Sequence, residues 1–184
     1  RDRCRRPDWW RVGSCRWSHV LSDEPETMSL DVSTIAGSGA DVRSLVKETV
    51  VAAPQMEVWQ AWTSNQDLSS WWGPPKSNIE LRVGGPFEIH FDLEQPEGLQ
   101  GSEGCKILSY APGESLSFTW NAPPHLPLRA AHTWVVMTFR NTSSGTSVRL
   151  VHTGFLEGPD WDDYMAYFDD AWGYVLGLLA DHWG

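Results

Sequence analysis

The C-terminal stretch from about residue 160 to 182 constrains the fold more than any other feature of this sequence. Large apolar and aromatic side chains recur along it at three- and four-residue steps, the spacing of one helix face. They are Trp161, Tyr164, Met165, Phe168, Trp172, Val175, Leu179 and His182. A helix of this length would measure ~35 Å at 1.5 Å per residue. A helix with so many aromatic residues on one face needs a large apolar surface to cover.

The preceding residues predict that surface as a set of antiparallel strands. Apolar residues alternate with polar ones, and turn residues such as Gly84-Gly85-Pro86 separate the runs. We expect strands at 45–51, 79–83, 87–93, 101–110, 116–120, 132–140 and 146–155. Two short helices are expected after the first strand, at about 58–62 and 65–72, the second capped by Asn65 and stopped by Gly73-Pro74-Pro75.

The order of these elements indicates an α+β fold in which a curved antiparallel sheet wraps around one long helix. Consecutive strands joined by tight turns form a meander of about six to seven strands. The first strand is left over and is expected to pair beside the last. The amphipathic helix then covers the concave face of the sheet.

The N-terminal residues differ from this pattern. Residues 1–44 are predicted to be a loosely ordered arm, and residues 45–184 the folded domain. Residues 1–27 hold six of the fourteen basic residues and two of the three cysteines, and they show no apolar period. We expect either that Met28 is the native start or that residues 1–27 are a disordered tail.

Charge and composition exclude several classes of partner. The formal net charge of -10 argues against a nucleic acid and against an anionic membrane surface. No apolar run approaches the ~18 residues that span a bilayer. Cys105 is the only cysteine after residue 27, so no disulfide framework or CxxC metal site is expected there. The default location is a reducing cytoplasm.

Seven short motifs in this order resemble the SRPBCC superfamily, also called START-like or helix-grip proteins. More narrowly, they resemble the C-terminal domain of activators of the ninety-kilodalton heat-shock-protein ATPase. The motifs are Ala53-Pro54 with Val58-Trp59 and Ala61-Trp62, Leu68-Ser69-Ser70-Trp71-Trp72-Gly73, Val83-Gly84-Gly85-Pro86-Phe87, Leu116-Ser117-Phe118-Thr119-Trp120, Thr146-Ser147-Val148-Arg149-Leu150, His152-Thr153-Gly154-Phe155 and Trp172-Gly173. The resemblance implies a cavity between sheet and helix that holds a hydrophobic small molecule. We expect either a monomer or a homodimer.

The aromatic content supports a cavity of this kind, although a filled core is the alternative. Aromatic rings bury large areas and leave gaps between rigid planes, and ligand pockets are mostly apolar. The candidate lining residues are Trp62, Trp71, Trp72, Phe87, Ile89, Phe91, Phe118, Trp120, Trp134, Val136, His152, Phe155, Tyr164, Phe168 and Trp172.

His152 is the candidate for acid–base chemistry because it shares a strand face with Val148 and Leu150. The alternative is a satisfied core histidine. His132 shares a face with Trp134, which makes a weaker case of the same kind, and His90 is expected to be solvated. The acidic residues around Asp160 fit a helix N-terminus better than a calcium loop. No phosphate loop, zinc spacing or Ser-His-Asp order is present in the sequence, so no cofactor or metal is expected.

Three functions follow as hypotheses. The first is a non-enzymatic protein that binds a lipid-like or polyketide-like molecule under the C-terminal helix. The second is a cyclase or hydrolase that uses His152 as a general base in the same cavity. The third is a chaperone-associated interaction module.

Overall fold

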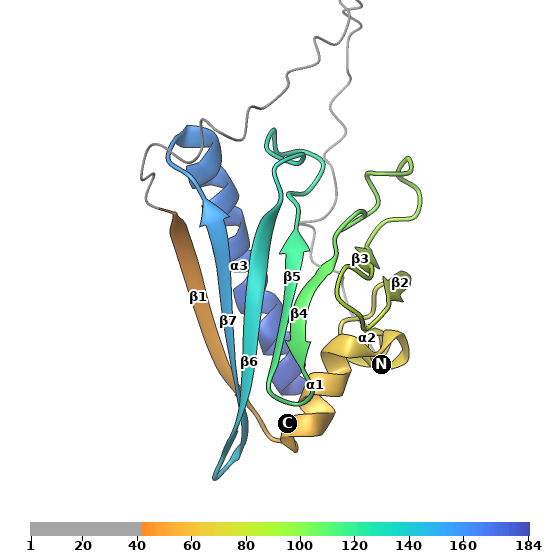
Figure 1. The fold of residues 1–184 in the computed structure, drawn as a ribbon, viewed down its shortest axis with the longest axis vertical. Helices are drawn as coiled ribbons and strands as arrows, with labels where there is room; N and C mark the ends of the chain where they lie inside the picture. The colour runs from red at the N-terminus through yellow and green to blue at the C-terminus, as the bar shows by residue number, and fades with distance from the viewer. Residues whose placement is uncertain (1–41) are drawn as a thin grey trace, which may run out of the picture. The chain divides into compact units, whose positions relative to one another are not determined.

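A five-stranded antiparallel sheet frames residues 42–184, the part of the chain that the computed structural model describes. Its strands lie in the order β1-β7-β6-β5-β4 (Figure 1). They are β1 (Arg43–Val51), β4 (Ile107–Ala111), β5 (Ser115–Trp120), β6 (Thr133–Thr142) and β7 (Gly145–Phe155). Strand β1 thus begins two residues before the strand start expected at residue 45. The expectations for residues 1–27, and for the arm up to residue 41, lie outside the described residues.

The first strand pairs beside the last, as the sequence predicts. β1 runs antiparallel to β7, with Leu45 opposite His152 and Thr49 opposite Val148. This places β1 at one edge of the sheet, while the meander β4-β5-β6-β7 supplies the rest. The α+β helix-grip architecture expected from the sequence is confirmed.

Two of the seven strands form a separate hairpin, which the sequence did not predict. β2 (Lys76–Ile79) pairs with β3 (Phe87–His90), and both are shorter than expected. Leu81 and Val83 are therefore exposed rather than part of a strand. Isolated bridges at Pro86–Lys106 and His90–Gly101 continue the curve toward β4.

Close backbone packing explains why the pairing between β3 and residues 101–106 is irregular. The amide of Ser102 donates to the carbonyl of Ile89, and the amide of Phe87 donates to the carbonyl of Cys105. A Cβ atom at Gly101 would lie 1.8 Å from the carbonyl oxygen of Ile89. Glycine is therefore required where the two segments cross.

Two short helices connect the sheet to the hairpin, as expected. They are α1 (Gln55–Thr63) and α2 (Asn65–Trp71). The cap of α2 is Ser64 rather than Asn65, because the Ser64 side chain accepts from the amide of Asp67. Asn65 instead accepts from the Ile79 amide through Oδ1, which ties α2 to β2.

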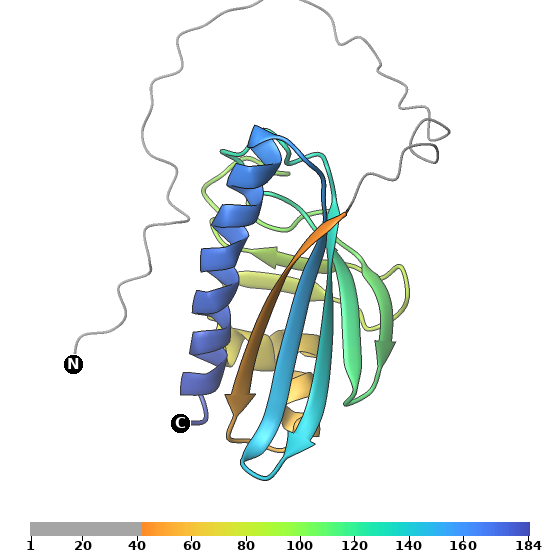
Figure 2. The ribbon, with the colours of Figure 1, turned by 90° about the vertical axis from the view of Figure 1, so that its left-hand side faces the viewer.

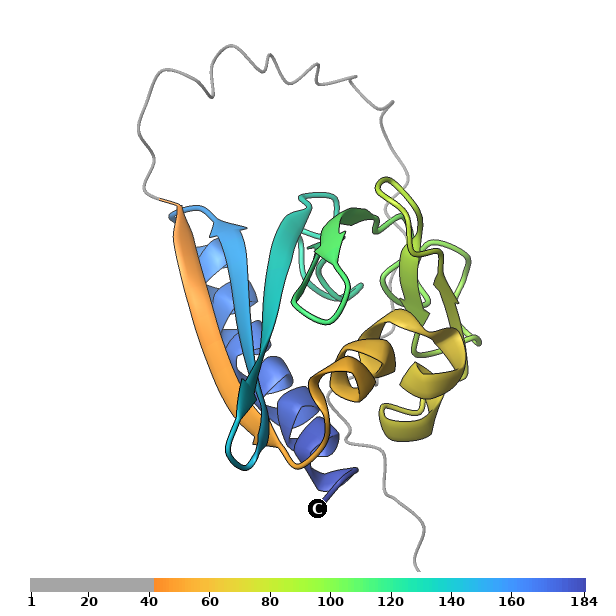
Figure 3. The ribbon, with the colours of Figure 1, turned by 60° about the horizontal axis from the view of Figure 1, so that its bottom comes forward.

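The long helix α3 (Pro159–Asp181) runs along the concave side of the sheet, and Figures 2 and 3 show it from two directions. Proline stands at its first turn, and Asp160 and Asp162 lie there too, which favours the helix dipole. Two ion pairs join it to β1: Arg43 with Asp162 and Lys47 with Asp169, at 2.5 and 2.9 Å. No helix in residues 42–184 is long and apolar enough to cross a membrane.

Candidate functional site

The concave side of the sheet brings together most of the aromatic residues that the sequence predicts for the site. Helices α1, α2 and α3, the β2–β3 hairpin and strands β5 and β7 all contribute to it. Thirteen of the fifteen predicted residues belong to this interior or pack against it: Trp62, Trp71, Trp72, Phe87, Ile89, Phe91, Phe118, Trp120, His152, Phe155, Tyr164, Phe168 and Trp172.

Trp134 and Val136 do not, and their prediction as lining residues is wrong. The inward face of β6 carries Thr133 and Val135, so the two predicted residues point outward. Trp134 is 38% exposed. A Cβ atom added at Gly154 would lie 2.8 Å from the nearest carbon of the Trp134 ring.

Seven of the thirteen inward residues have no surface accessible to water, and they therefore border no void large enough for a water molecule. They are Trp62, Phe87, Ile89, Phe118, His152, Phe155 and Tyr164. Phe87 and Phe118 stack with their ring centroids 4.0 Å apart. This part of the predicted site is tightly packed core in the present structure.

Five of the remaining six residues, all except Trp71, form a second region that reaches the surface. We call Trp72, Phe91, Trp120, Phe168 and Trp172 the aromatic cluster. Trp120 and Trp172 are buried, with ring centroids 5.3 Å apart, whereas Trp72 and Phe91 are half-buried. The cluster thus extends from half-buried rings at the surface to buried rings on β5 and α3.

The loop of residues 121–132, between β5 and β6, lies next to this cluster. Its partly buried Leu126 and Leu128 pack against the core, and the ring of His125 contacts Tyr167 of α3 at 5.7 Å. Partial burial lowers the pKa of His125 below its ordinary value. Tyr167 also meets Phe168 edge to face, so the loop reaches the rim of the aromatic cluster through α3.

A buried polar chain lies beneath the aromatic cluster and engages both nitrogens of His152. Trp172 donates from Nε1 to Nδ1 of His152 over 3.0 Å. Nδ1 is therefore unprotonated, and Nε2 carries the proton and donates to Thr133 Oγ1 over 2.6 Å. Thr133 in turn donates to the carbonyl of Trp120, and Tyr164 Oη lies 3.3 Å from Thr133 Oγ1.

This geometry does not suit His152 for general-base catalysis. The ring has no exposed surface, and burial lowers its pKa to about 3. A general base needs access to the substrate proton, a free lone pair and a pKa near the working pH. The structure thus favours the alternative that the sequence left open, a satisfied core histidine that connects α3 to β6 and β7. Thr133 was not predicted as a site residue, because only the strand pairing reveals its inward position.

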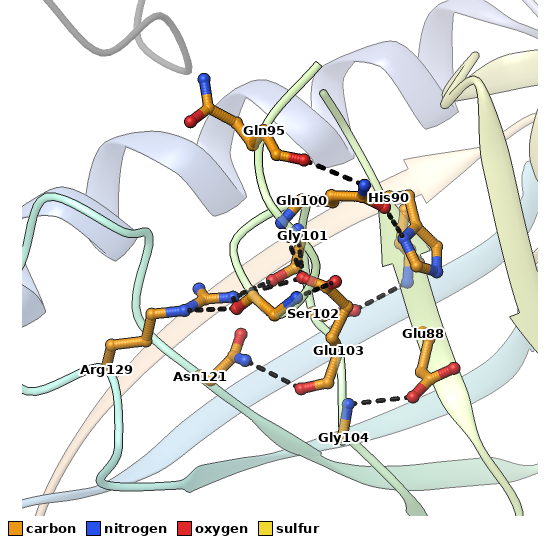
Figure 4. A network of polar contacts seen from close by, with 12 residues as sticks. Glu88, His90, Gln95, Gln100, Gly101, Ser102, Glu103, Gly104, Asn121 and Arg129 are labelled. Carbon is orange, nitrogen blue, oxygen red and sulfur yellow. Dashed lines mark hydrogen bonds and ion pairs between the residues drawn. The ribbon is translucent and has the colours of Figure 1, made fainter. Parts of the chain in front are cut away.

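A second polar network ties two loops together (Figure 4). The carboxylate of Glu103 accepts from the backbone amides of Gly98, Gln100 and Gly101 at 2.6, 2.6 and 3.1 Å. Arg129 lies 3.5 Å from Glu103 and donates to the carbonyls of Gly98, Gly101 and Ala122. Burial of the guanidinium lowers the pKa of Arg129. The network holds the 121–132 loop against the connection between β3 and β4.

Two further predictions concern the surroundings of these networks. His90 is buried rather than solvated, and its Nδ1 lies 3.2 Å from Gln100 Oε1, because the β3–β4 connection folds back over it (Figure 4). Residues 42–184 contain no group of three or more His, Cys, Asp or Glu side chains that could hold a metal ion.

Burial raises the pKa of Cys105 to about 12, so its thiol is protonated at neutral pH.

A polar pocket of about 420 Å³ lies elsewhere, near the start of α1 and the β4–β5 turn. Its lining includes Gln55, Glu114 and Arg140 and none of the fifteen predicted residues. Gln55 Nε2 already donates to the carbonyls of Gly113 and Phe139. The pocket therefore does not correspond to the apolar site that the sequence predicts.

Comparisons with known proteins agree with this architecture. A family model described as "Activator of Hsp90 ATPase homolog 1-like protein" matches residues 52–184. Among solved structures, protein MLL2253 from Mesorhizobium loti is 25% identical, with a TM-score of 0.60 over 76% of this chain and 96% of that one. The Aha1 dimer from Colwellia psychrerythraea is 20% identical, with a TM-score of 0.58 over 77% and 96%.

A third similar structure is DynU16, described as a putative protein in the dynemicin biosynthetic locus. It is 18% identical, with a TM-score of 0.56 over 76% of this chain and 46% of that one. The comparison with curated proteins found no match.

Proposed function

The chain belongs to the family of Activator of Hsp90 ATPase homolog 1-like proteins, within the SRPBCC superfamily, and we propose that it binds a hydrophobic or aromatic small molecule at the aromatic cluster. The ligand class is lipid-like or polyketide-like. The ligand enters between the β2–β3 hairpin and α3 and is bound without chemical change.

The observation that carries this proposal is the half-buried state of Trp72 and Phe91. Their ring centroids lie 5.5 Å apart, and Trp72 continues inward to Trp120 and Trp172. Ligand sites are typically concave, apolar and aromatic, with few polar groups. Burying an exposed aromatic surface against a ligand gains free energy in proportion to the area removed from water.

One further observation supports binding rather than general-base catalysis. His152 is hydrogen-bonded to Trp172 of the cluster, and both of its ring nitrogens are already engaged. The fold neighbour DynU16 is described as a putative protein in the dynemicin biosynthetic locus, and this description is compatible with a small-molecule ligand for either a binding protein or an enzyme.

Titration with oleate and with emodin, followed by tryptophan fluorescence and native mass spectrometry, tests the proposal. We expect one of the two to bind and to be recovered unchanged in mass. Phe91→Ala should weaken that binding about 10-fold, since an aromatic contact is worth ~1.5–3 kcal/mol when fully buried and Phe91 is half-buried.

Trp134→Ala is the matched control, because Trp134 is an exposed aromatic residue on the outer face of the sheet. It should leave the affinity unchanged. The proposal fails if neither compound binds, or if Trp134→Ala weakens binding as much as Phe91→Ala does. Recovery of a chemically altered ligand would favour the enzyme hypothesis instead.

A further inference from the structure

Trp72 stands at the centre of the aromatic residues of the domain. Its ring contacts five other aromatic side chains with centroid separations of 5.3–6.5 Å. These are Trp62 at 5.6 Å, Trp71 at 5.3 Å, Phe91 at 5.5 Å, Trp120 at 6.5 Å and Trp172 at 6.3 Å.

The five neighbours come from separate elements that surround the Trp72 ring. Trp62 belongs to α1 and Trp71 to α2, while Trp120 ends β5 and Trp172 lies on α3. Phe91 directly follows β3. The Trp72 indole therefore fills a box with aromatic walls, a space of the size and shape of one bicyclic ring system.

The Trp72 indole differs from two of its neighbours in how it is attached to the fold. Trp71 and Trp172 each donate a hydrogen bond from Nε1, to the Ala61 carbonyl and to His152. Within residues 42–184 the Trp72 indole is held by ring contacts, and it remains half-buried. It follows the last residue of α2 and precedes Gly73, whose φ is +72° and whose surroundings are open.

Trp62 adds a polar requirement to this box. The side chain has no exposed surface, and its Nε1–H has no hydrogen-bond partner among the described residues. Leaving a buried donor unpaired costs free energy, and such a group in a native structure calls for an explanation. An acceptor atom on a bound molecule would satisfy it.

We propose that the Trp72 indole and the ligand compete for the same position, and that the ligand is a flat aromatic compound with a hydrogen-bond acceptor that displaces the indole. This inference rests on the proposed function and specifies its ligand class. The incoming ring replaces the stacking and edge contacts of the indole with the five walls, and its acceptor binds the Trp62 Nε1–H. Trp72 swings toward solvent about the Gly73 junction and covers the ligand from outside.

This arrangement makes the effect of removing Trp72 opposite to that of removing a wall. When the open state has a population of ~1–10%, the apparent affinity is reduced by that fraction. Trp72→Ala removes the internal competitor, and affinity for an aromatic probe should rise by about 10- to 100-fold. A wall variant such as Phe91→Ala should lower the affinity for the same probe.

The experiment uses quinoline and naphthalene, two bicyclic rings of the same shape of which only quinoline has an acceptor nitrogen. Binding is measured by calorimetry to the full chain, to Trp72→Ala and to Trp72→Phe, with Trp134→Ala as control. Tighter binding to Trp72→Ala, with Trp72→Phe in between, supports the inference. Weaker binding to Trp72→Ala than to the unchanged chain overturns it, because Trp72 is then a wall.

A second measurement follows the Trp72 ring in the unchanged sequence and needs only the conservative variant Trp72→Phe for its assignment. The chain is labelled with 5-fluorotryptophan, and the Trp72 signal in the ¹⁹F spectrum is assigned by its loss in Trp72→Phe. Saturating quinoline should shift this signal toward that of the exposed Trp134. A Trp72 signal that stays in place while quinoline binds overturns the inference and leaves the proposed function standing.

The acceptor requirement is tested by the ratio of the two affinities. The quinoline-to-naphthalene affinity ratio is measured in Trp72→Ala and in the double variant that also carries Trp62→Phe. The ratio should be about 2- to 10-fold higher in the single variant, the equivalent of one net hydrogen bond. An unchanged ratio overturns the acceptor assignment. If neither oleate nor emodin binds the unchanged chain, the proposed function itself fails.

Discussion

The indole Nε1 of Trp172 donates to Nδ1 of His152 over 3.0 Å in the interior of the domain. Trp172 lies on α3, and His152 lies on β7, so this hydrogen bond fixes the rotation of the helix against the sheet. His152 is in turn hydrogen-bonded through Nε2 to Thr133 Oγ1 on β6. One side chain thus joins the three elements that define the inner end of the aromatic cluster.

Trp172→Phe should lower the free energy of unfolding by about 2–4 kcal/mol. The change leaves Nδ1 of His152 without a donor and removes part of a buried ring, and both effects are destabilising. Chemical denaturation at pH 7 measures the difference. Trp134→Phe at an exposed position should stay within about 0.5 kcal/mol of the unchanged protein, and equal losses in the two variants would contradict the assignment.

Acid should destabilise the protein through His152. The folded state keeps this ring neutral with its pKa lowered to about 3, whereas the unfolded chain binds a proton near the ordinary value of 6.5. Below pH 6.5 the unfolded state therefore holds more protons, and stability falls as the pH falls toward 3. The contribution is about 1.4 kcal/mol per pH unit.

Denaturation curves between pH 7 and 4 check this slope. His152→Gln should be less stable at pH 7 but should lose less stability on acidification than the unchanged chain. The same substitution at His182, which is exposed, controls for the loss of a histidine. Parallel pH profiles for His152→Gln and the unchanged chain would show that the ring is not a buried neutral group.

The sequence predicted the helix-grip architecture because its signals are local and repeated. The period of α3, the turn residues between strands and the alternation in β5 and β7 each depend on neighbouring residues. The face of β6 was predicted wrongly because Val135 and Val136 are adjacent, so either alternation puts valine inside. The strand pairing determines which valine points inward, because Trp134 lies opposite Thr119 and Thr153 on the outer face.

The polar networks were beyond the sequence for a different reason. Thr133, His152 and Trp172 are separated along the chain by 19 and 20 residues, and their contact depends on how α3 crosses the sheet. Glu103 and Arg129 lie in loops that show no apolar periodicity, so only the folded structure brings the two charged side chains together. Whether aromatic rings fill a space or leave it open depends on their rotamers, which alternation does not specify.

Arg129→Met should destabilise the domain by about 2–4 kcal/mol and loosen two loops. The side chains of Arg129 and Glu103 are only about one-seventh exposed, so loss of the cation leaves a poorly hydrated carboxylate and several carbonyls without donors. Hydrogen exchange should accelerate at Gly98, Gln100 and Gly101 and across 121–132. Arg149→Met breaks an exposed pair with Glu48 and should cost less than about 1 kcal/mol.

Accelerated exchange confined to the two loops would agree with a local clamp. Acceleration spread evenly over β1 and β7 would instead indicate global destabilisation and contradict the role given to Arg129.

Two glycine-to-alanine substitutions should have opposite effects on stability. Gly177 lies within α3, is exposed and has no heavy atom within 4 Å of a Cβ. Gly177→Ala should therefore raise the free energy of unfolding by about 0.5–1 kcal/mol, because alanine loses less backbone entropy in a helix. At Gly101 the same change places a Cβ atom 1.8 Å from the carbonyl oxygen of Ile89. This oxygen is a backbone atom of β3, with which Gly101 pairs irregularly. Gly101→Ala should lower stability by more than about 2 kcal/mol, since the two segments must move apart. Thermal unfolding of both variants beside the unchanged chain measures the two signs, and a tolerated Gly101→Ala would mean that the β3 crossing is looser than the structure shows.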